Sequence, residues 1–514
     1  MSRLLTAIIN LSLRSIRLIV FNEQGEKIYE DWLPIRTYID GLKVEQDPNE
    51  WWEGFLSLFS GFRRKKIGVI GYISVTSSAL CLIPIDKKGK PLTRVIMVSD
   101  KRAEEQANLL KSHPLASVLQ KNPSFSISPS YMIPKIMWLK DNDKQVFKKT
   151  YKFLSSNDYL IYKLTGKIAT DYLNAEKSYF DIYTNLYQPE AIKFLGLSQN
   201  NFPKVVELGT KIGLLKASLV KKFKLDKSPQ VFITTYDAIC AFLGSGVSHE
   251  GELSNVCGTC SSYRVFSKKS LGINSNGILS QYLKKDKLFI VGGSNNLEGG
   301  LLEWVKQCFY GESYQKDNDF LYKLMEDEAR QSSLGAQGMI FLPYLLGERV
   351  PFWDPHVRGI FFGVERFHQR KDFVRSAFEA TAFQAKLMLN SLEDHKIKIK
   401  TIKMSGGLSD IELICQLRAD IIGRPIDVIE ERESTALGAF ILIQRARRKI
   451  KSISESSRIV KLRKTFTPNK KNNYLYNKVF KMYEDLYTLN QKLFKKRYQF
   501  INILSKEGKV VENL

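Results

Sequence analysis

The sequence predicts an α/β protein with two duplicated domains, followed by a C-terminal helical segment. Three observations support this class. The chain has 514 residues, 44% of them hydrophobic, which is enough for two or more buried cores. A β-hairpin with a polar tip is expected over residues 4–25, and a second hairpin of the same design over residues 252–267. Alternating strand-like and helical stretches follow each hairpin, as in α/β domains.

The two hairpins open the two halves of the chain, so the first domain boundary is expected near residues 247–251. The paired strands of the hairpins are expected at 4–9 with 16–21 and at 252–256 with 263–267, with the polar stretch 10–15 as the first turn. Further strands are expected at 67–73, 231–235, 399–404 and 426–429, and helices at 101–111, 133–141, 145–153, 237–243, 300–309, 372–392, 409–422 and 434–445.

The positive charge of the chain is concentrated at its end. The formal net charge is +25, and residues 445–514 hold 19 lysines and arginines against 5 acidic residues. A nucleic-acid partner would explain such a segment. However, four aromatic residues recur there at helical spacing: Tyr476, Phe480, Tyr483 and Tyr487. We therefore favour a terminal helix that packs through its aromatic face and exposes its lysines.

The cysteine content and the N-terminal residues indicate the compartment. Six cysteines in so long a chain are too few and too scattered for a disulfide framework, so a reducing, cytoplasmic location is expected. Residues 4–21 are apolar, but Arg14 and Arg17 interrupt them, which argues against a signal peptide or membrane anchor. Cys257 and Cys260 form a C-x-x-C, yet no second Cys/His pair accompanies it, so neither zinc nor redox chemistry is expected.

Three segments could carry chemistry, and each has a purely structural alternative. Asp237 begins an otherwise apolar helix, where a carboxylate serves either as a helix cap or as the base that takes a hydroxyl proton. The tip Gly258-Thr-Cys-Ser261 suits a phosphate-binding loop or a plain tight hairpin. Ser405-Gly-Gly-Leu-Ser409 joins a strand to a helix and would either hold a flat ligand such as a purine or form a tight turn.

The chain resembles the FGGY family of carbohydrate kinases, most of all its xylulokinase and gluconokinase branches. The resemblance covers nearly the whole chain and rests on blocks in the family's order. In the first half these are Asp100-Lys-Arg102, Asp158-Tyr159, Leu164-Thr-Gly166, Thr170-Asp171 with Ala175, and Asp237 with Gly244 and Gly246. In the second half they are Gly347-Glu-Arg-Val-Pro351, Asp354-Pro-His-Val-Arg358-Gly359, Ser405-Gly-Gly407, Gln416, Ala419-Asp420, Gly423-Arg-Pro425 and Glu433-Ser-Thr-Ala-Leu-Gly-Ala439.

The resemblance implies a two-domain ATPase fold of the actin/hexokinase type with a central cleft. Residues 1–248 would form the N-terminal, sugar-binding domain, residues 249–446 the C-terminal, nucleotide-binding domain, and residues 447–514 the basic helical segment. The implied reaction is ATP-dependent phosphorylation of a hydroxyl group on a ketose, polyol or sugar acid. The expected partners are this sugar, ATP and a second copy of the chain in a homodimer, with no nucleic acid and no membrane.

The resemblance also assigns roles to single residues. Asp237 would be the general base. Gly258 and Thr259 would hold the β- and γ-phosphates, and Gly406 and Gly407 the adenosine. Mg²⁺ would neutralise the phosphate charge, because catalysis in such kinases depends mainly on positioning and electrostatics.

The first hairpin departs from the family pattern, which is Asp-x-Gly-Thr-Thr. Here the chain reads Asn10-Leu-Ser-Leu-Arg14, so the acidic group that organises magnesium is replaced by a weak, neutral ligand at Asn10, and Leu13 lies where a phosphate would bind. Arg14 offers a compensating contact with phosphate. Two hypotheses follow: an active sugar kinase, or a catalytically impaired relative that binds sugar, nucleotide or a partner.

The sugar-binding positions differ too. Ser78-Ala-Leu80 stands where relatives carry Gln-Met-His or Gln-Arg-Glu, so only Ser78 is retained as a candidate substrate contact. Thr234, Thr235 and Tyr236 replace the glycines that usually precede the catalytic carboxylate. The identity of the substrate is therefore open.

Overall fold

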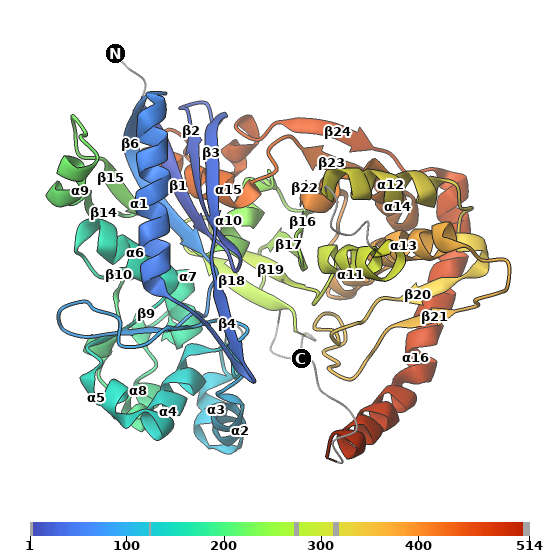
Figure 1. Cartoon of the computed structure of the whole chain (residues 1–514), viewed down its shortest axis with the longest axis horizontal. Coiled ribbons are helices and arrows are strands. Elements are labelled where there is room, and N and C mark those ends of the chain that lie inside the picture. Colours follow the sequence, from blue (N-terminus) through green and yellow to red (C-terminus); the bar gives the residue numbers. More distant parts are fainter. Residues whose placement is uncertain (1–3, 123–124, 272–276, 312–317, 507–514) are drawn as a thin grey trace. The chain divides into compact units, whose positions relative to one another are not determined.

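The computed structural model describes residues 4–122, 125–271, 277–311 and 318–506 (Figure 1). The chain divides into two compact units. The first unit contains residues up to 244 together with 433–459, and the second contains 245–432 together with the residues from 460 onward.

The first unit is built on a six-stranded sheet whose centre is parallel. Its strands in spatial order are β14 (Lys211–Leu214), β15 (Gln230–Ile233), β6 (Val69–Ser77), β1 (Leu4–Leu11), β2 (Ser15–Phe21) and β3 (Lys27–Pro34). The pairs β15–β6 and β6–β1 are parallel, whereas β14, β2 and β3 are antiparallel to their neighbours. The carboxyl ends of β1, β6 and β15 therefore lie at one edge of the sheet.

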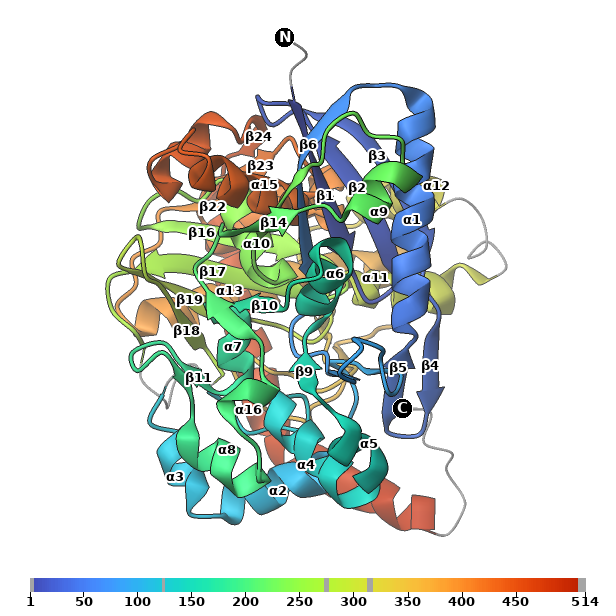
Figure 2. The same ribbon diagram turned by 90° about the vertical axis from the view of Figure 1, so that its left-hand side faces the viewer.

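Helix α1 (Pro48–Lys65) packs along β2 and β3, as Figure 2 shows. Asp47 caps it by accepting a hydrogen bond from the Asn49 amide, Pro48 occupies its first turn, and Lys66 ends it in a left-handed conformation. Its buried face carries Trp51, Phe55, Leu58, Phe59 and Phe62. Because these side chains recur every three or four residues, they form one apolar stripe against the sheet.

The remaining elements of the first unit form small sheets and short helices. The strands are β4 (Thr37–Asp40), β5 (Lys43–Gln46), β7 (Ile83–Ile85), β8 (Val95–Ile96), β9 (Lys152–Leu154), β10 (Ala169–Asp171), β11 (Phe180–Asp181), β12 (Leu186–Tyr187) and β13 (Lys204–Val206). The helices are α2 (Glu104–Ser112), α3 (Leu115–Leu119), α4 (Met132–Asn142), α5 (Lys144–Lys149), α6 (Ser156–Thr165), α7 (Tyr172–Ala175), α8 (Pro189–Leu195), α9 (Ala217–Lys222), α10 (Asp237–Gly244) and α15 (Ser434–Ala446).

Helices α10 and α15 pack together although about 190 residues separate them in the chain. Two glycines allow this contact. A Cβ atom on Gly244 would lie 1.9 Å from the Ser434 carbonyl oxygen, and one on Gly438 would lie 1.8 Å from the Cys240 carbonyl oxygen. Only glycine permits two helix backbones to approach this closely, which explains why α15 belongs to the first unit.

The second unit repeats the sheet of the first. Its seven strands in spatial order are β18 (Leu279–Leu283), β19 (Leu288–Ser294), β17 (Ser261–Ser267), β16 (Glu252–Cys257), β22 (Thr401–Gly406), β23 (Ile426–Ile429) and β24 (Leu462–Phe466). The pairs β16–β22 and β22–β23 are parallel, and β17, β19 and β24 are antiparallel to their neighbours. Read from β24 to β19, the strands of this sheet pair in the same order and with the same parallel and antiparallel directions as the strands from β14 to β3 in the first sheet. This match supports the predicted duplication.

Helices cover the second sheet, and a short hairpin stands beside them. The helices are α11 (Gly299–Phe309), α12 (Asn318–Arg330), α13 (Arg370–Asp394), α14 (Glu412–Ile422) and α16 (Lys470–Lys506), and the hairpin is β20 (Ile340–Leu342) with β21 (Ile360–Phe362). Short 3₁₀ segments lie at 176–178, 199–201, 336–338, 407–410 and 453–458.

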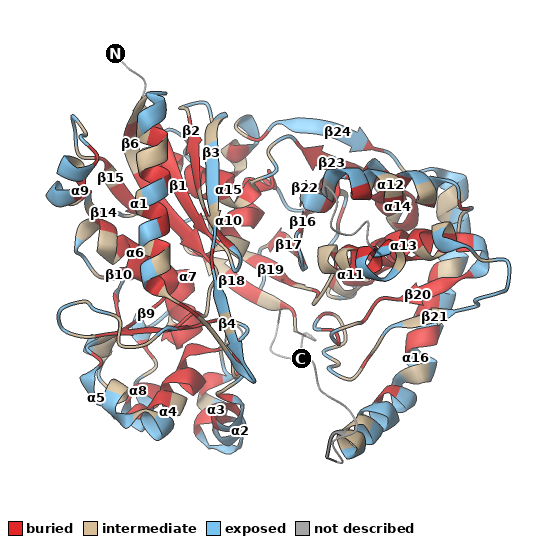
Figure 3. Ribbon diagram, in the orientation of Figure 1, coloured by how far each residue is buried: buried red, intermediate tan, exposed pale blue. Residues whose placement is uncertain are grey.

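Helix α16 packs through its aromatic face, as the sequence predicts. Tyr476, Phe480, Tyr483 and Tyr487 are buried in the core of the second unit, where Tyr483 donates or accepts a hydrogen bond of 3.0 Å with the Tyr344 hydroxyl. In Figure 3 the first turns of the helix alternate between buried and exposed residues, whereas its far end is largely exposed. Much of the basic charge therefore lies on the solvated side of a packed helix.

Several sequence-based boundaries were wrong. The helix expected over 145–153 ends at Lys149, and β9 begins at Lys152 because Phe153 and Leu154 are buried beside β7. The helix expected to begin at residue 409 begins at Glu412, after a 3₁₀ turn over 407–410. The turn of the first hairpin is shorter than expected, since β1 continues to Leu11; Asn10 thus lies within a strand.

Candidate functional site

Three of the predicted site residues lie at the carboxyl edge of the first sheet. Asn10 is the second-last residue of β1, Ser78 follows β6 directly, and Asp237 begins α10 four residues beyond the end of β15. Because these parallel strands are neighbours, their carboxyl ends present the three side chains along one edge, the usual place for ligands in such sheets. The Ser78 hydroxyl donates a hydrogen bond of 3.2 Å to Oδ2 of Asp237.

The Asp237 carboxylate is half-buried, and its other oxygen, Oδ1, accepts a 2.7 Å hydrogen bond from the Ala238 amide. The turn before it is anchored by two threonines. Thr234 donates to the Val75 carbonyl at 2.9 Å, and Thr235 donates to Oδ1 of Asp171 at 2.9 Å. The side chains that replace the expected glycines therefore tie this turn to β6 and to the end of β10.

Asp171 is an anchor whose contact with Thr235 the sequence did not reveal. It is fully buried, caps α7 by accepting hydrogen bonds from the Leu173 and Asn174 amides, and accepts another from the Asn174 side chain. Burial raises the pKa of Asp171 to about 7, against the opposing effect of these donors. In the sequence, Asp171 was indicated only by the motif Thr170-Asp171, which matches the family that the chain resembles.

Hydrogen bonds within the first hairpin and from Gln46 stabilise the tip of the first hairpin. The Ser12 hydroxyl hydrogen-bonds with the backbone and side chain of Ser15, and the Leu13 carbonyl accepts a 2.8 Å hydrogen bond from Nε2 of Gln46. Gln46 is fully buried and in turn accepts a hydrogen bond from the Trp51 indole at 3.0 Å. The buried Gln46 side chain thus ties the backbone of the tip, at the Leu13 carbonyl, to Trp51 of α1.

The exposed side chains of this tip differ in character. Leu13 is 41% exposed. Arg14 is exposed as well, and its guanidinium has no hydrogen bond or ion pair with any residue that the structure describes. Arg17, by contrast, forms an ion pair with Glu433, the residue that precedes α15. Arg14 is therefore the basic side chain of the hairpin that remains available to an anion.

The tip of the second hairpin, Gly258 to Cys260, contacts the start of α11. Its carbonyls point toward the start of α11: Gly258 accepts from the Gly299 amide at 3.0 Å, and Thr259 accepts from the Glu298 amide at 2.8 Å. Within the described parts of the chain, the amides of Thr259 and Cys260 have no hydrogen-bond acceptor, and both residues are exposed. Two free neighbouring amides favour an anion such as phosphate.

Gly406 and Gly407 lie beside this tip. Gly406 ends β22 opposite Cys257 in the parallel pair, and its φ of +90° is one that side chains rarely adopt. A Cβ atom there would lie 2.3 Å from the Cys257 carbonyl oxygen. The two glycines and the hairpin tip therefore share the carboxyl edge of the second sheet.

A buried ion pair supports the second tip, and no sequence pattern pointed to it. Arg418 on α14 and Glu298 before α11 are both fully buried and in contact. Glu298 also accepts hydrogen bonds from the Tyr263 hydroxyl at 2.9 Å and from Asn295 at 3.1 Å, while Arg418 contacts Sγ of Cys257 at 2.9 Å. These contacts pair the two buried charges and link the strand ends below the tip.

The available donors suit a metal that arrives with a nucleotide. In the ranges that the structure describes, no cluster of three or more His, Cys, Asp or Glu side chains could hold a metal ion. Mg²⁺ usually keeps several waters and binds one or two carboxylates besides phosphate oxygens. At the edge of the first sheet the corresponding oxygens belong to Asp237 and Asn10. Cys257 is buried and Cys260 exposed, and both are free thiols.

Comparison with known proteins identifies the class. The N-terminal domain model of the FGGY family of carbohydrate kinases matches residues 7–244, and the C-terminal domain model matches residues 253–446. The chain is 25% identical to a gluconokinase of Bacillus subtilis over 88% of this chain and 89% of the relative. It is 26% identical to a xylulose kinase of Staphylococcus epidermidis over 94% and 97%, respectively.

The solved structures agree on the fold. A gluconate kinase from Lactobacillus acidophilus superposes with a TM-score of 0.86 at 24% identity, covering 96% of this chain and 99% of that one. The fold is thus the two-domain ATPase fold of the actin/hexokinase type, and the class is an ATP-dependent phosphotransferase that acts on a hydroxyl group of a sugar-type acceptor. The chain belongs to the FGGY family of carbohydrate kinases. As a separate observation, none of the described helices has the length and apolar character needed to cross a bilayer.

Proposed function

We propose that the chain phosphorylates a ketose, polyol or sugar acid, with Asp237 as the general base. The observation that carries this proposal is the Asp237 carboxylate at the carboxyl edge of the parallel strands, half-buried and hydrogen-bonded to Ser78. A carboxylate held in this way can accept the proton of a sugar hydroxyl as its oxygen attacks the γ-phosphorus of ATP. The gluconokinase and xylulose kinase relatives favour a sugar acid or a ketose as the acceptor.

The nucleotide roles follow from the second unit. The free amides at the second hairpin tip and the side chain of Thr259 would hold the β- and γ-phosphates. Gly406 and Gly407 would leave room for the adenosine. Arg14 would contact phosphate directly, which would offset the missing acidic group at Asn10. Bound Mg²⁺ would supply charge neutralisation for the phosphates.

A second candidate function rests on the first hairpin. Asn10 supplies no negative charge, and the exposed Leu13 offers neither a hydroxyl nor an amide side chain to phosphate. These two residues favour a catalytically impaired protein that binds sugar, nucleotide or a partner protein.

Turnover of Asp237→Asn tests the proposal. Conversion of ATP to ADP would be measured with a panel of pentuloses, hexonates and polyols. The wild-type chain should show sugar-dependent turnover, and Asp237→Asn should lower kcat by a factor of about 10² to 10⁴, as expected when a general base is removed. Asp40→Asn is the matched control, because the Asp40 side chain is 86% exposed on β4.

The two functions give opposite results in this assay. Sugar-dependent turnover that survives in Asp237→Asn would show that another group is the base. A wild-type chain that binds ATP or a sugar of the panel in calorimetry but shows no turnover would favour the impaired protein.

A further inference from the structure

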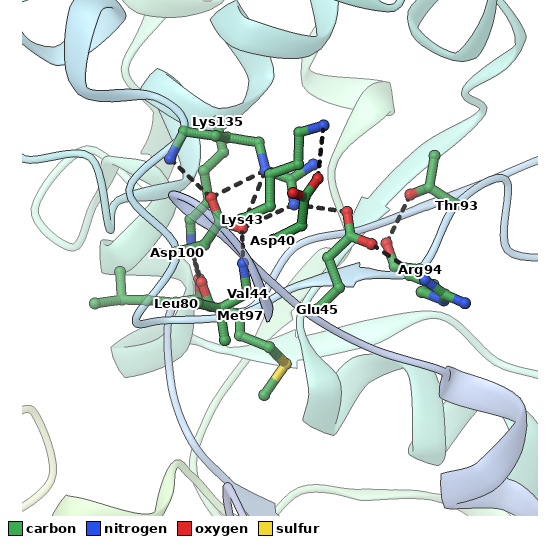
Figure 4. A network of polar contacts seen from close by, with 11 residues as sticks. Asp40, Lys43, Val44, Glu45, Leu80, Thr93, Arg94, Met97, Asp100 and Lys135 are labelled. Atoms are coloured by element: carbon green, nitrogen blue, oxygen red, sulfur yellow. Dashed lines mark hydrogen bonds and ion pairs between the residues drawn. The ribbon is translucent and has the colours of Figure 1, made fainter. Parts of the chain in front are cut away.

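Lys135 on α4 is a buried cation that contacts the loop carrying Ser78, outside the site described so far. Its side chain is completely buried, and its ammonium group donates hydrogen bonds to the carbonyls of Leu80 at 2.6 Å and Met97 at 2.8 Å (Figure 4). Burial lowers the pKa of Lys135 to about 8. Burying a charged ammonium group costs free energy, and both of its hydrogen-bond acceptors are neutral carbonyls. We therefore ask what the two carbonyls that Lys135 joins do in the fold.

One of the two carbonyls belongs to a strained loop. Leu80 has a φ of +67°, a conformation that non-glycine residues rarely adopt. The loop runs from the end of β6 at Ser77 to Leu80, and it carries Ser78, whose hydroxyl contacts Asp237. The ammonium group of Lys135 thus holds the loop two residues from the Ser78 side chain.

The other carbonyl belongs to a rigid frame. The Met97 carbonyl also accepts the Asp100 amide at 3.2 Å, and the Met97 amide donates to the Val44 carbonyl at 3.0 Å. Oδ2 of the fully buried Asp100 accepts the Val44 amide at 2.6 Å, and Arg102 forms an ion pair with the same carboxylate at 2.8 Å. Figure 4 shows the Lys135, Met97, Val44 and Asp100 contacts of this frame.

We propose that Lys135 is a positioning residue: its ammonium group links this frame to the Leu80 carbonyl, keeps Leu80 left-handed and so holds the Ser78 hydroxyl against Asp237. The proposal rests on the proposed role of Asp237 as the base. Lys135 itself has no contact with Asp237 among the hydrogen bonds of the described residues, so it acts through the loop.

The first test is structural and needs no turnover. Lys135→Met keeps a side chain of similar length and removes the ammonium group. In its crystal structure, Leu80 should leave the positive-φ region and Ser78 Oγ should move out of hydrogen-bond distance of Asp237 Oδ2. An unchanged Leu80 φ with an intact Ser78 contact would overturn the proposal, whatever the activity of the wild-type chain.

The second test is a double-mutant cycle with Ser78→Ala. Lys135→Met should lower kcat/KM about tenfold or more in the wild-type background, but less than about threefold in the Ser78→Ala background. An equal loss in both backgrounds would mean that Lys135 supports the fold only, and would overturn the proposal. Lys386→Met is the matched control, because Lys386 is also a buried lysine that donates to a carbonyl, that of Ile421 at 2.9 Å, in the second unit.

A third variant covers the case in which Lys135→Met does not fold. Glycine adopts a positive φ without steric cost, so Leu80→Gly should restore folding to Lys135→Met if the lysine is needed to hold the loop. Failure of the double variant to fold would overturn the proposal. If Asp237→Asn keeps full turnover, the proposed base is wrong, while the position of Leu80 in Lys135→Met still decides whether the lysine holds the loop.

Discussion

At the scale of single residues, the largest departure from the family pattern is at Asn10, where a neutral amide replaces the acidic group expected to organise magnesium. It lies near the carboxyl end of β1, opposite Thr76 of β6 and Arg17 of β2, and is 7% exposed. An aspartate would fit this space, because the two side chains have nearly the same volume. The substitution Asn10→Asp therefore changes charge with little change in packing.

Asn10→Asp should lower the Mg²⁺ concentration for half-maximal turnover by about tenfold, since one additional nearby carboxylate attracts a divalent cation by at least ~1.4 kcal/mol even when screened. The measurement is a magnesium titration of the rate of sugar-dependent ADP formation. Asn10→Ala serves as the control for loss of the amide. A half-maximal concentration that is the same in all three proteins would place the metal away from this strand.

The buried Asp171 carboxyl should make the free energy of unfolding depend on pH. Its folded pKa of about 7 lies above the value of about 4 in an unfolded chain, so the folded state binds the proton more tightly. The stability it contributes is complete below about pH 4 and is lost as the pH rises through about 7. Asp171→Asn removes this titration, and the difference in its urea midpoint between pH 5 and pH 8 should be smaller than that of the wild-type chain.

The size of this effect has an upper bound. A shift of about three pKa units corresponds to ~4 kcal/mol, and this shift already includes the opposing effect of the hydrogen bonds from Asn174 and Thr235. Wild-type and Asp171→Asn chains with the same pH dependence between pH 5 and pH 8 would show that Asp171 stays ionised.

At the scale of elements, the sequence predicted some parts well. The two hairpins and helix α10 could be predicted, because alternating apolar residues and the position of Asp237 are local signals. Helix α1 has equally local signals, a cap at Asp47 and an apolar stripe, yet it was missing from the predicted elements. The helix expected over 145–153 was too long. Its sequence pattern is helical, but Phe153 and Leu154 pair with β7 in a two-stranded sheet, so the helix ends before them.

The contact between α10 and α15 is the element-level feature most sensitive to mutation. Gly438→Ala would place a Cβ atom 1.8 Å from the Cys240 carbonyl, so the helices must separate, at a cost of about 1–3 kcal/mol or more. The matched control is Gly61→Ala within α1, where the nearest atom lies 3.6 Å away and better helix propensity should raise stability by up to ~1 kcal/mol. Urea denaturation followed by circular dichroism measures both; equal midpoints for the two variants would contradict the close contact.

At the scale of the whole molecule, the basic C-terminal segment is part of the second core. Phe480 is 5% exposed and Leu489 is 77% exposed, although both lie on α16. Phe480→Ala should destabilise the chain by about 3–5 kcal/mol, whereas Leu489→Ala should change stability by less than about 0.5 kcal/mol. Thermal unfolding distinguishes them. Similar small effects of both substitutions would mean that α16 is peripheral to the fold.

The sequence by itself determined the class of this protein: two hairpin-led α/β halves, a packed aromatic stripe at the end, and the ordered motifs of a carbohydrate kinase family. These features could be predicted because each depends on residues that are near one another in the chain. The tertiary structure decided that α15 joins the first unit, that Gln46 and Trp51 hold the first hairpin tip, and that Ser78 contacts Asp237 while Lys135 contacts the Leu80 carbonyl. Such contacts join distant segments, and whether they form depends on backbone approach and side-chain packing in three dimensions.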